Sequence, residues 1–109
     1  MSINLKKNER AALLRLKAAL SENLDLLDFR IFGSKARGDS EPESDIDVMI
    51  EVEEYTSGSE SLIDDLIFDT NLEYDCFISA IIFGRRELED GPMSESPIYK
   101  TIEKEGQRI

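Results

Sequence analysis

The hydrophobic positions along the chain follow two different repeats, one typical of helices and one typical of strands. Residues 4–22 carry leucine and alanine at intervals of three and four, which predicts an amphipathic helix, and residues 62–72 show the same spacing. Residues 46–52 have one apolar face and one face that carries acids, as in a half-buried strand. Short apolar runs at 27–32 and 74–83 predict two further strands.

Turn and capping residues divide these segments. Gly33 and Ser34 follow the first predicted strand, and Ser34 can cap a short helix that begins near Lys35. A short helix is also predicted at 85–89, and Ser96 can cap a last helix that runs through Lys104. The predicted order is αβαβαβα. It indicates an α/β fold with a small, mixed three-stranded sheet and flanking helices, in a single domain that spans residues 1–109.

Charge and composition narrow the class of protein. The net charge is −11, and the segment from Gly38 to Gly84 holds fourteen Asp and Glu residues but no Lys or Arg. Such a surface is a poor partner for extended nucleic acid, whose phosphates are bound by basic side chains. We find no apolar run of membrane-spanning length and no recognisable signal peptide after Met1. With Cys76 as its single cysteine, the sequence predicts a cytoplasmic protein that does not enter a membrane.

The residues with the clearest chemistry lie between Gly33 and Asp47. Gly33 and Ser34 form a small-residue turn at the end of a predicted strand, which suits the close approach of a phosphate. Asp45 and Asp47 project from the same face of the next strand, with α-carbons about 6–7 Å apart. At that separation both carboxylates can bind one Mg²⁺, or each can bind one of a close pair. The chain has no histidine, which excludes histidine-based triads and histidine-ligated zinc sites.

Asp75 is the predicted third carboxylate. It stands near the start of the predicted strand 74–83, with Phe77 and Ser79 on the same face. Three carboxylates suit nucleotidyl transfer, because Mg²⁺ bridges an acidic site and a nucleoside triphosphate and polarises the α-phosphate. Asp75 would either complete the metal site beside the attacking hydroxyl or accept the proton of that hydroxyl.

Other residues near these acids have simpler interpretations. Glu51 shares the parity of Asp45 and Asp47, but it lies farther along the strand and is expected to face solvent. Met49 is expected to pack beneath the site, since its thioether is too soft a ligand for Mg²⁺. Cys76 is expected to pack in the core.

Two segments resemble the signature of the minimal nucleotidyltransferases, which are small members of the DNA polymerase beta-like nucleotidyltransferase superfamily. These are Gly33-Ser34-Lys35-Ala36-Arg37-Gly38 and Ser44-Asp45-Ile46-Asp47-Val48. The resemblance continues through Asp75, on the strand that carries the family's third carboxylate, to residues 96–106, which are similar to the family's C-terminal segment. It implies the nucleotidyltransferase fold and a transferase that uses ATP as substrate and Mg²⁺, as two ions, as cofactor.

The resemblance also implies roles for individual residues. Gly33 and Ser34 would bind the triphosphate of ATP, and the catalytic and metal-binding acids would be Asp45, Asp47 and Asp75. Arg37 would contact phosphate, although an ion pair with the neighbouring acids is an equally good interpretation. Stand-alone members are commonly paired with a HEPN-domain toxin and transfer AMP to one of its tyrosines. The resemblance therefore implies the antitoxin of a toxin-antitoxin system that acts by AMPylation of its partner.

Two other functions stay open on the sequence alone. The chain could neutralise a partner by binding without catalysis, or it could transfer the nucleotide to a small molecule. The second is weakened by length, because 109 residues leave no obvious second domain for a small acceptor. Ser34 and the three aspartates favour the enzyme, since a protein that only binds has no physical need for that set. Assembly with itself or with a partner is compatible with either function.

Overall fold

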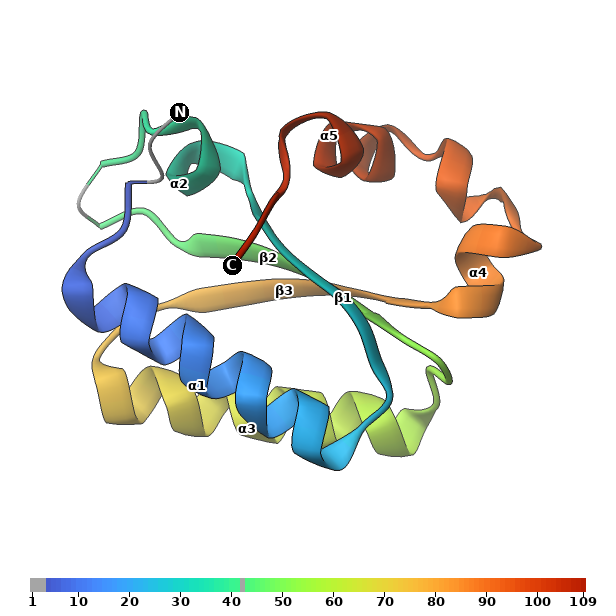
Figure 1. The fold of residues 1–109 in the computed structure, drawn as a ribbon, viewed down its shortest axis with the longest axis horizontal. Coiled ribbons are helices and arrows are strands. Elements are labelled where there is room, and N and C mark those ends of the chain that lie inside the picture. The colour runs from blue at the N-terminus through green and yellow to red at the C-terminus, as the bar shows by residue number, and fades with distance from the viewer. Residues whose placement is uncertain (1–3, 42) are drawn as a thin grey trace.

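A mixed four-stranded sheet lies at the centre of the computed structural model, which describes residues 4–41 and 43–109. The strand order is β3-β2-β1-β4, where β1 and β2 are antiparallel, β2 and β3 are parallel, and β4 is antiparallel to β1 (Figure 1). The strands are β1 (Leu26–Phe32), β2 (Ile46–Val52), β3 (Ile78–Gly84) and β4 (Gln107–Arg108). The α/β fold class is confirmed, and the two-residue β4 is an addition that the sequence pattern did not predict.

Helices cover the sheet on both faces (Figure 1). One face carries α1 (Lys7–Asn23) and α3 (Ser57–Tyr74), and α2 (Gly33–Arg37), α4 (Arg85–Glu89), a 3₁₀ helix (Pro92–Glu95) and α5 (Pro97–Glu105) lie on the other side. The predicted cap of the last helix is confirmed, because the hydroxyl of Ser96 accepts a hydrogen bond from the amide of Tyr99 at 3.3 Å. No helix within the described ranges is both long enough and apolar enough to cross a membrane.

The alternation along β2 gives the sheet a separate apolar core on each face. The even-numbered residues of β2 lie in the larger core with side chains of α1 and α3. On the other face, Met49 is fully buried against Phe83 and Ile102, as expected for a residue that supports the site from below. Cys76 also belongs to the larger core, and burial raises the pKa of its thiol.

The start of the third strand differs from the prediction. α3 continues through Tyr74, and Asp75 is its C-cap, with a left-handed φ of 54°. The side chain of Asn71 joins the end of this helix to the next strand, because its Oδ1 accepts the amide of Ile78 at 2.8 Å. β3 begins only at Ile78. The prediction that Asp75 lies on the third strand is therefore wrong: Asp75 lies in the turn that precedes the strand.

Candidate active site

The predicted phosphate turn forms where β1 ends and α2 begins. Gly33 has a φ of +74°, and Gly38, which follows α2, has a φ of +84°. Both angles lie in the left-handed region that glycine adopts without steric cost. The amide of Gly38 donates to the carbonyl of Ser34 at 2.9 Å, which closes the single turn of helix between the two glycines. Ser34, half-buried, lies in the first turn of α2, whose N-cap is Phe32, so the prediction that Ser34 caps this helix is wrong.

The sheet brings this turn to the predicted acids. β1 and β2 are antiparallel neighbours, and Phe32 pairs with Asp47. Gly33 follows Phe32 directly, and a β-carbon built on Gly33 would lie only 2.4 Å from Oδ2 of Asp47. Glycine is therefore required at this position for two reasons: its backbone angle and the closeness of the carboxylate.

Asp45 and Asp47 form an uneven pair of carboxylates. Asp45 is exposed, just before the start of β2, whereas Asp47 is half-buried within the strand. The pKa of Asp47 is raised, first by burial and then by the negative charge of Asp45, while the charge of Arg37 acts in the opposite direction. A bound cation would offset this repulsion, and carboxylate oxygens are the ligands that Mg²⁺ prefers. Asp45 and Asp47 thus fit the divalent metal that the sequence predicts.

Arg37 forms the ion pairs that were one of its two predicted roles. Its guanidinium lies 3.3 Å from a carboxylate oxygen of Asp39 and 3.1 Å from one of Glu105. Its side chain is still 47% exposed, so both pairs lie in solvent and contribute little to stability. Because the charge of Arg37 also acts on Asp47, the guanidinium is close enough to influence the site. Its contact with a phosphate stays a prediction.

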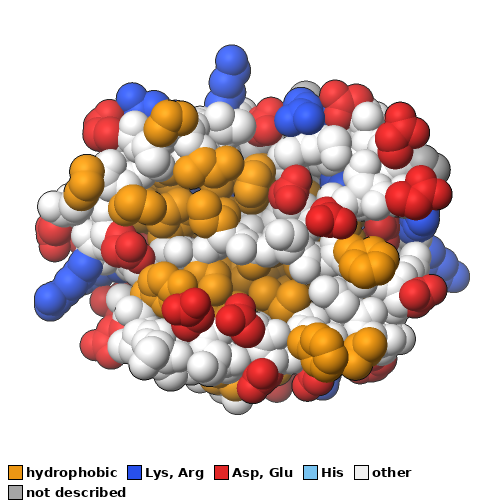
Figure 2. Space-filling model, turned by 180° about the vertical axis from the view of Figure 1, so that it is seen from behind, with side chains coloured by type: hydrophobic (Ala, Val, Ile, Leu, Met, Phe, Trp, Pro, Cys, Tyr) orange, Lys and Arg blue, Asp and Glu red, His pale blue; other side chains and the backbone are white. Residues whose placement is uncertain are grey.

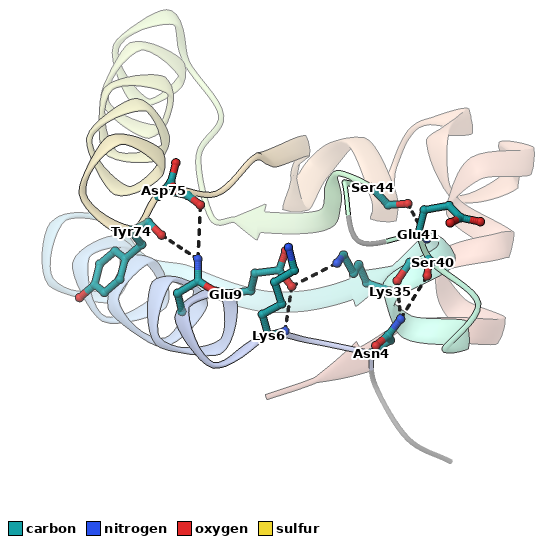
Figure 3. A network of polar contacts seen from close by, with 10 residues as sticks. Asn4, Lys6, Glu9, Lys35, Ser40, Glu41, Ser44, Tyr74 and Asp75 are labelled. Atoms are coloured by element: carbon teal, nitrogen blue, oxygen red, sulfur yellow. Dashed lines mark hydrogen bonds and ion pairs between the residues drawn. The ribbon is translucent and has the colours of Figure 1, made fainter.

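A buried ion pair holds α2 against the start of α1. Nζ of Lys35 lies 3.1 Å from Oε1 of Glu9, and the side chains are only 2% and 6% exposed (Figure 3). The same Glu9 oxygen accepts the amide of Lys6 at 2.9 Å, and the amide of Asn4 donates to the carbonyl of Lys35 at 2.9 Å. The phosphate turn is therefore attached to the start of α1 by charged and backbone hydrogen bonds. The sequence pattern does not predict this pair, because Lys35 and Glu9 are 26 residues apart in the chain.

Asp75 is placed differently from the other predicted site residues. The carbonyls of Tyr74 and Asp75 accept hydrogen bonds from the side chain of Asn8, which holds the end of α3 against α1 (Figure 3). On β3, the residue in register with Asp47 is Ser79, which is exposed. Within residues 4–41 and 43–109, no three or more His, Cys, Asp or Glu side chains are grouped so that they could hold a metal ion. The structure brings together the turn, Arg37 and the aspartate pair, whereas Asp75, the predicted third acid, precedes the strand and Ser79 lies beside Asp47.

Ser79 could have been recognised from the sequence. The alternation along 74–83 already placed it on one face with Asp75, and only the starting point of the strand had to be corrected.

Glu51 is separated from the aspartate pair by buried Met49. Contrary to the expectation that it faces solvent, it is half-buried opposite Asp28. The pKa of Glu51 is raised, chiefly by burial and then by the charge of Asp28.

Comparisons with known proteins agree with this fold. A solved structure named provisionally as a minimal nucleotidyltransferase has 18% sequence identity and a TM-score of 0.63, over 92% of this chain and 91% of that chain. At this identity the likeness shows the fold alone. A comparison with curated proteins gave no match. The model of the family described as "Nucleotidyltransferase domain" matches residues 13–108, a range that includes both the phosphate turn and the aspartate pair. The chain belongs to the nucleotidyltransferase domain family.

Proposed function

We propose that this chain transfers AMP from ATP to a tyrosine hydroxyl of a HEPN-domain toxin, with Mg²⁺ as cofactor, and thereby acts as the antitoxin of that toxin. The observation that carries the chemistry is the contact between the phosphate turn and the acids, where a β-carbon on Gly33 would lie 2.4 Å from Asp47 Oδ2. A triphosphate bound at the turn lies beside the metal-binding carboxylates. The HEPN partner and the tyrosine acceptor rest on the resemblance to minimal nucleotidyltransferases.

Some residues of the site bind the nucleotide, and others bind the metal. Gly33 and Ser34 bind the triphosphate, and Arg37, which is 47% exposed, can turn from its acids to a phosphate oxygen. Asp45 and Asp47 hold the metal, which supplies charge neutralisation at the α-phosphate and at the departing pyrophosphate. In the transfer, the tyrosine oxygen forms a bond to the α-phosphorus and the bond to the pyrophosphate breaks. The hydroxyl proton leaves to a carboxylate, for which Asp75 is the predicted residue, or to water.

One observation favours a second function, in which the chain neutralises its partner by binding alone. The described residues hold no group of three acids that could bind a metal, and Ser79 lies where a third acid would stand beside Asp47. A site with only two carboxylates fits a protein that has kept the fold and the nucleotide turn but not full catalytic power. Transfer to a small molecule stays a third proposal without an observation in its favour.

Label transfer separates these functions. The chain is incubated with α-labelled ATP, Mg²⁺ and the purified protein encoded by the adjacent reading frame. We expect label on a tyrosine of that protein, and loss of the label in Asp45→Ala/Asp47→Ala. A matched control, Glu22→Gln/Asp25→Asn, removes two exposed charges at the other end of β2 and should label normally.

Two results would decide against the enzyme. If no label reaches the protein while Asp45→Ala/Asp47→Ala still neutralises its toxicity in cells, the chain acts by binding alone. If ATP with Mg²⁺ also fails to raise the melting temperature of the wild-type chain, the nucleotide site itself is refuted, because a ligand that binds only the folded state must stabilise it.

A further inference from the structure

Three large apolar side chains are exposed together beside the candidate site. Phe68 and Leu72 of α3 are 62% and 68% exposed, and Phe77, just before β3, is 69% exposed. These are the highest values among the exposed large hydrophobic residues of the described chain. The three side chains line one hollow of about 290 Å³ together with Asn71, Asp75 and Cys76. We refer to Phe68, Leu72 and Phe77 as the apolar patch.

The apolar patch adjoins the aspartate pair. The carbonyl of Phe77 accepts the amide of Ile46 at 2.8 Å, and Ile46 lies between Asp45 and Asp47 in the chain. Phe77 is thus about one strand spacing, roughly 5 Å, from the backbone that carries the acids. A protein seated on the patch would reach over the site at which a nucleotide is transferred.

Acidic side chains surround the patch. Asp64 and Asp65 precede Phe68 by one helical turn, and Asp69, Glu73 and Asp75 lie next to Phe68, Leu72 and the hollow; all five are exposed. No Lys or Arg occurs between Gly38 and Gly84. Figure 2, which views the molecule from the side of β3, shows apolar side chains bordered by acidic ones across this face, with the basic side chains at its margins.

The acidic rim around the apolar patch indicates which kind of molecule can bind there. A second copy of the chain would bring the same acidic rim against this one, and an anionic lipid surface would be repelled in the same way. A protein surface with apolar residues inside a border of Lys and Arg is complementary in both respects. Exposed apolar surface of this kind, rimmed by polar residues, is typical of protein interaction sites.

We infer that the apolar patch and its acidic rim are the surface on which the acceptor protein docks, through an apolar cluster bordered by basic side chains, so that its hydroxyl lies over Asp45 and Asp47. This inference rests on the proposed function, because it assigns the acceptor of that same site. It also accounts for how this domain recognises an acceptor, since the docking surface lies beside the proposed catalytic residues.

Binding and label transfer, measured separately, test the inference. The probe is the protein encoded by the adjacent reading frame, and its affinity is measured by calorimetry without nucleotide. We expect Phe68→Ser/Leu72→Ser/Phe77→Ser to weaken binding at least about tenfold, or 1.4 kcal/mol, as for central apolar contacts. The rim variant Asp65→Lys/Asp69→Lys should weaken it as well and should reduce the salt dependence of association. Leu14→Ser/Leu27→Ser, which removes two exposed leucines on α1 and β1, should leave binding unchanged.

The outcomes distinguish this inference from the proposed function. If the apolar and rim variants both bind within about twofold of wild type, the docking surface is refuted, whether or not label is transferred. If both variants lose binding but the wild type transfers no label, the docking surface stands and the proposed activity fails. If the wild type does not bind the probe at all, both fail. If the wild type forms a dimer and the apolar variant does not, the patch serves self-association and the inference is overturned.

Melting curves establish that each variant is folded. The rim variant, which changes only exposed side chains, provides a second test if the apolar variant is not folded.

Discussion

Gly33 lies so close to Asp47 across the β1–β2 pair that no space remains between them for a methyl group. A β-carbon on Gly33 would lie 2.4 Å from Oδ2 of Asp47, far inside van der Waals contact, and the φ of +74° would strain any other residue. Glycine at this position is therefore needed both for the backbone conformation of the turn and for the space that the carboxylate of Asp47 occupies.

Gly33→Ala should weaken both the binding of ATP and the stability of the fold. We expect ATP affinity in the presence of Mg²⁺ to fall at least about tenfold, because the added methyl displaces Asp47. The left-handed backbone should cost about 1–2 kcal/mol in the free energy of unfolding. Thermal shift with and without ATP and Mg²⁺ measures both effects. Gly58→Ala is the control: its nearest atom would be 3.7 Å away, and alanine in this helix should be neutral or stabilising. Unchanged ATP affinity in Gly33→Ala would show that the contact is not needed.

Substitution of one member of the Lys35–Glu9 pair should lower the free energy of unfolding more than substitution in an exposed ion pair. Lys35→Met leaves the carboxylate of Glu9 buried without its charged partner, which typically costs about 3–5 kcal/mol in the free energy of unfolding. Urea denaturation measures this cost, and the double variant Lys35→Met/Glu9→Gln should recover much of it. Lys100→Met is the exposed counterpart, because its pair with Glu95 has side chains 60% and 75% exposed, and it should cost less than about 1 kcal/mol. Equal costs for the two single variants would contradict the role of burial.

The pKa of Asp47 should respond in opposite directions to its two charged neighbours. Asp45→Asn removes a negative charge that raises the pKa of Asp47, so this pKa should fall toward its ordinary value. Arg37→Ala removes a positive charge that lowers it, so the pKa should rise further. Carboxyl carbon chemical shifts in a pH titration of the metal-free chain measure both variants. Shifts of the same sign in the two variants would exclude this electrostatic arrangement.

Ser79→Asp should create the third carboxylate that the described residues lack. Ser79 is exposed and in register with Asp47 on the parallel neighbour β3, so an aspartate there would face the metal site from the adjacent strand. We expect Mn²⁺, used as a spectroscopic substitute for Mg²⁺, to bind about tenfold more tightly. Ser61→Asp adds the same charge on the exposed surface of α3 and should change Mn²⁺ affinity little. If both substitutions tighten binding equally, the effect is one of net charge and not of position.

The sequence predicted those features of the site that depend on local pattern. The alternation of Ile46, Val48 and Ile50 set the faces of β2, and with them the side of the sheet on which Asp47 lies. The glycine turn at Gly33 was recognised because few residues suit such a backbone. These features need only neighbours in the chain.

Features that depend on where an element ends were harder to predict. Leu72, Glu73 and Tyr74 suit a helix or a strand, and α3 keeps them because its C-cap, Asp75, adopts the left-handed conformation. Because β3 begins only at Ile78, Asp75 lies off the sheet, and the register between β2 and β3 places Ser79 beside Asp47. The burial of Lys35 could not be predicted either, since its partner Glu9 lies in a distant part of the sequence.

The pairing of Phe32 with Asp47 determines where the chain can accept insertions. The ladder between β1 and β2 holds the turn and Asp47 together, so the connection from Asp39 to Ser44 is not needed for that purpose. Lengthening such a connection costs little, about 0.6 kcal/mol for each doubling of its length. Insertions there would leave the pairing of the turn with Asp47 intact, which makes this connection a natural place for evolution, or for an inserted reporter peptide, to add new sequence.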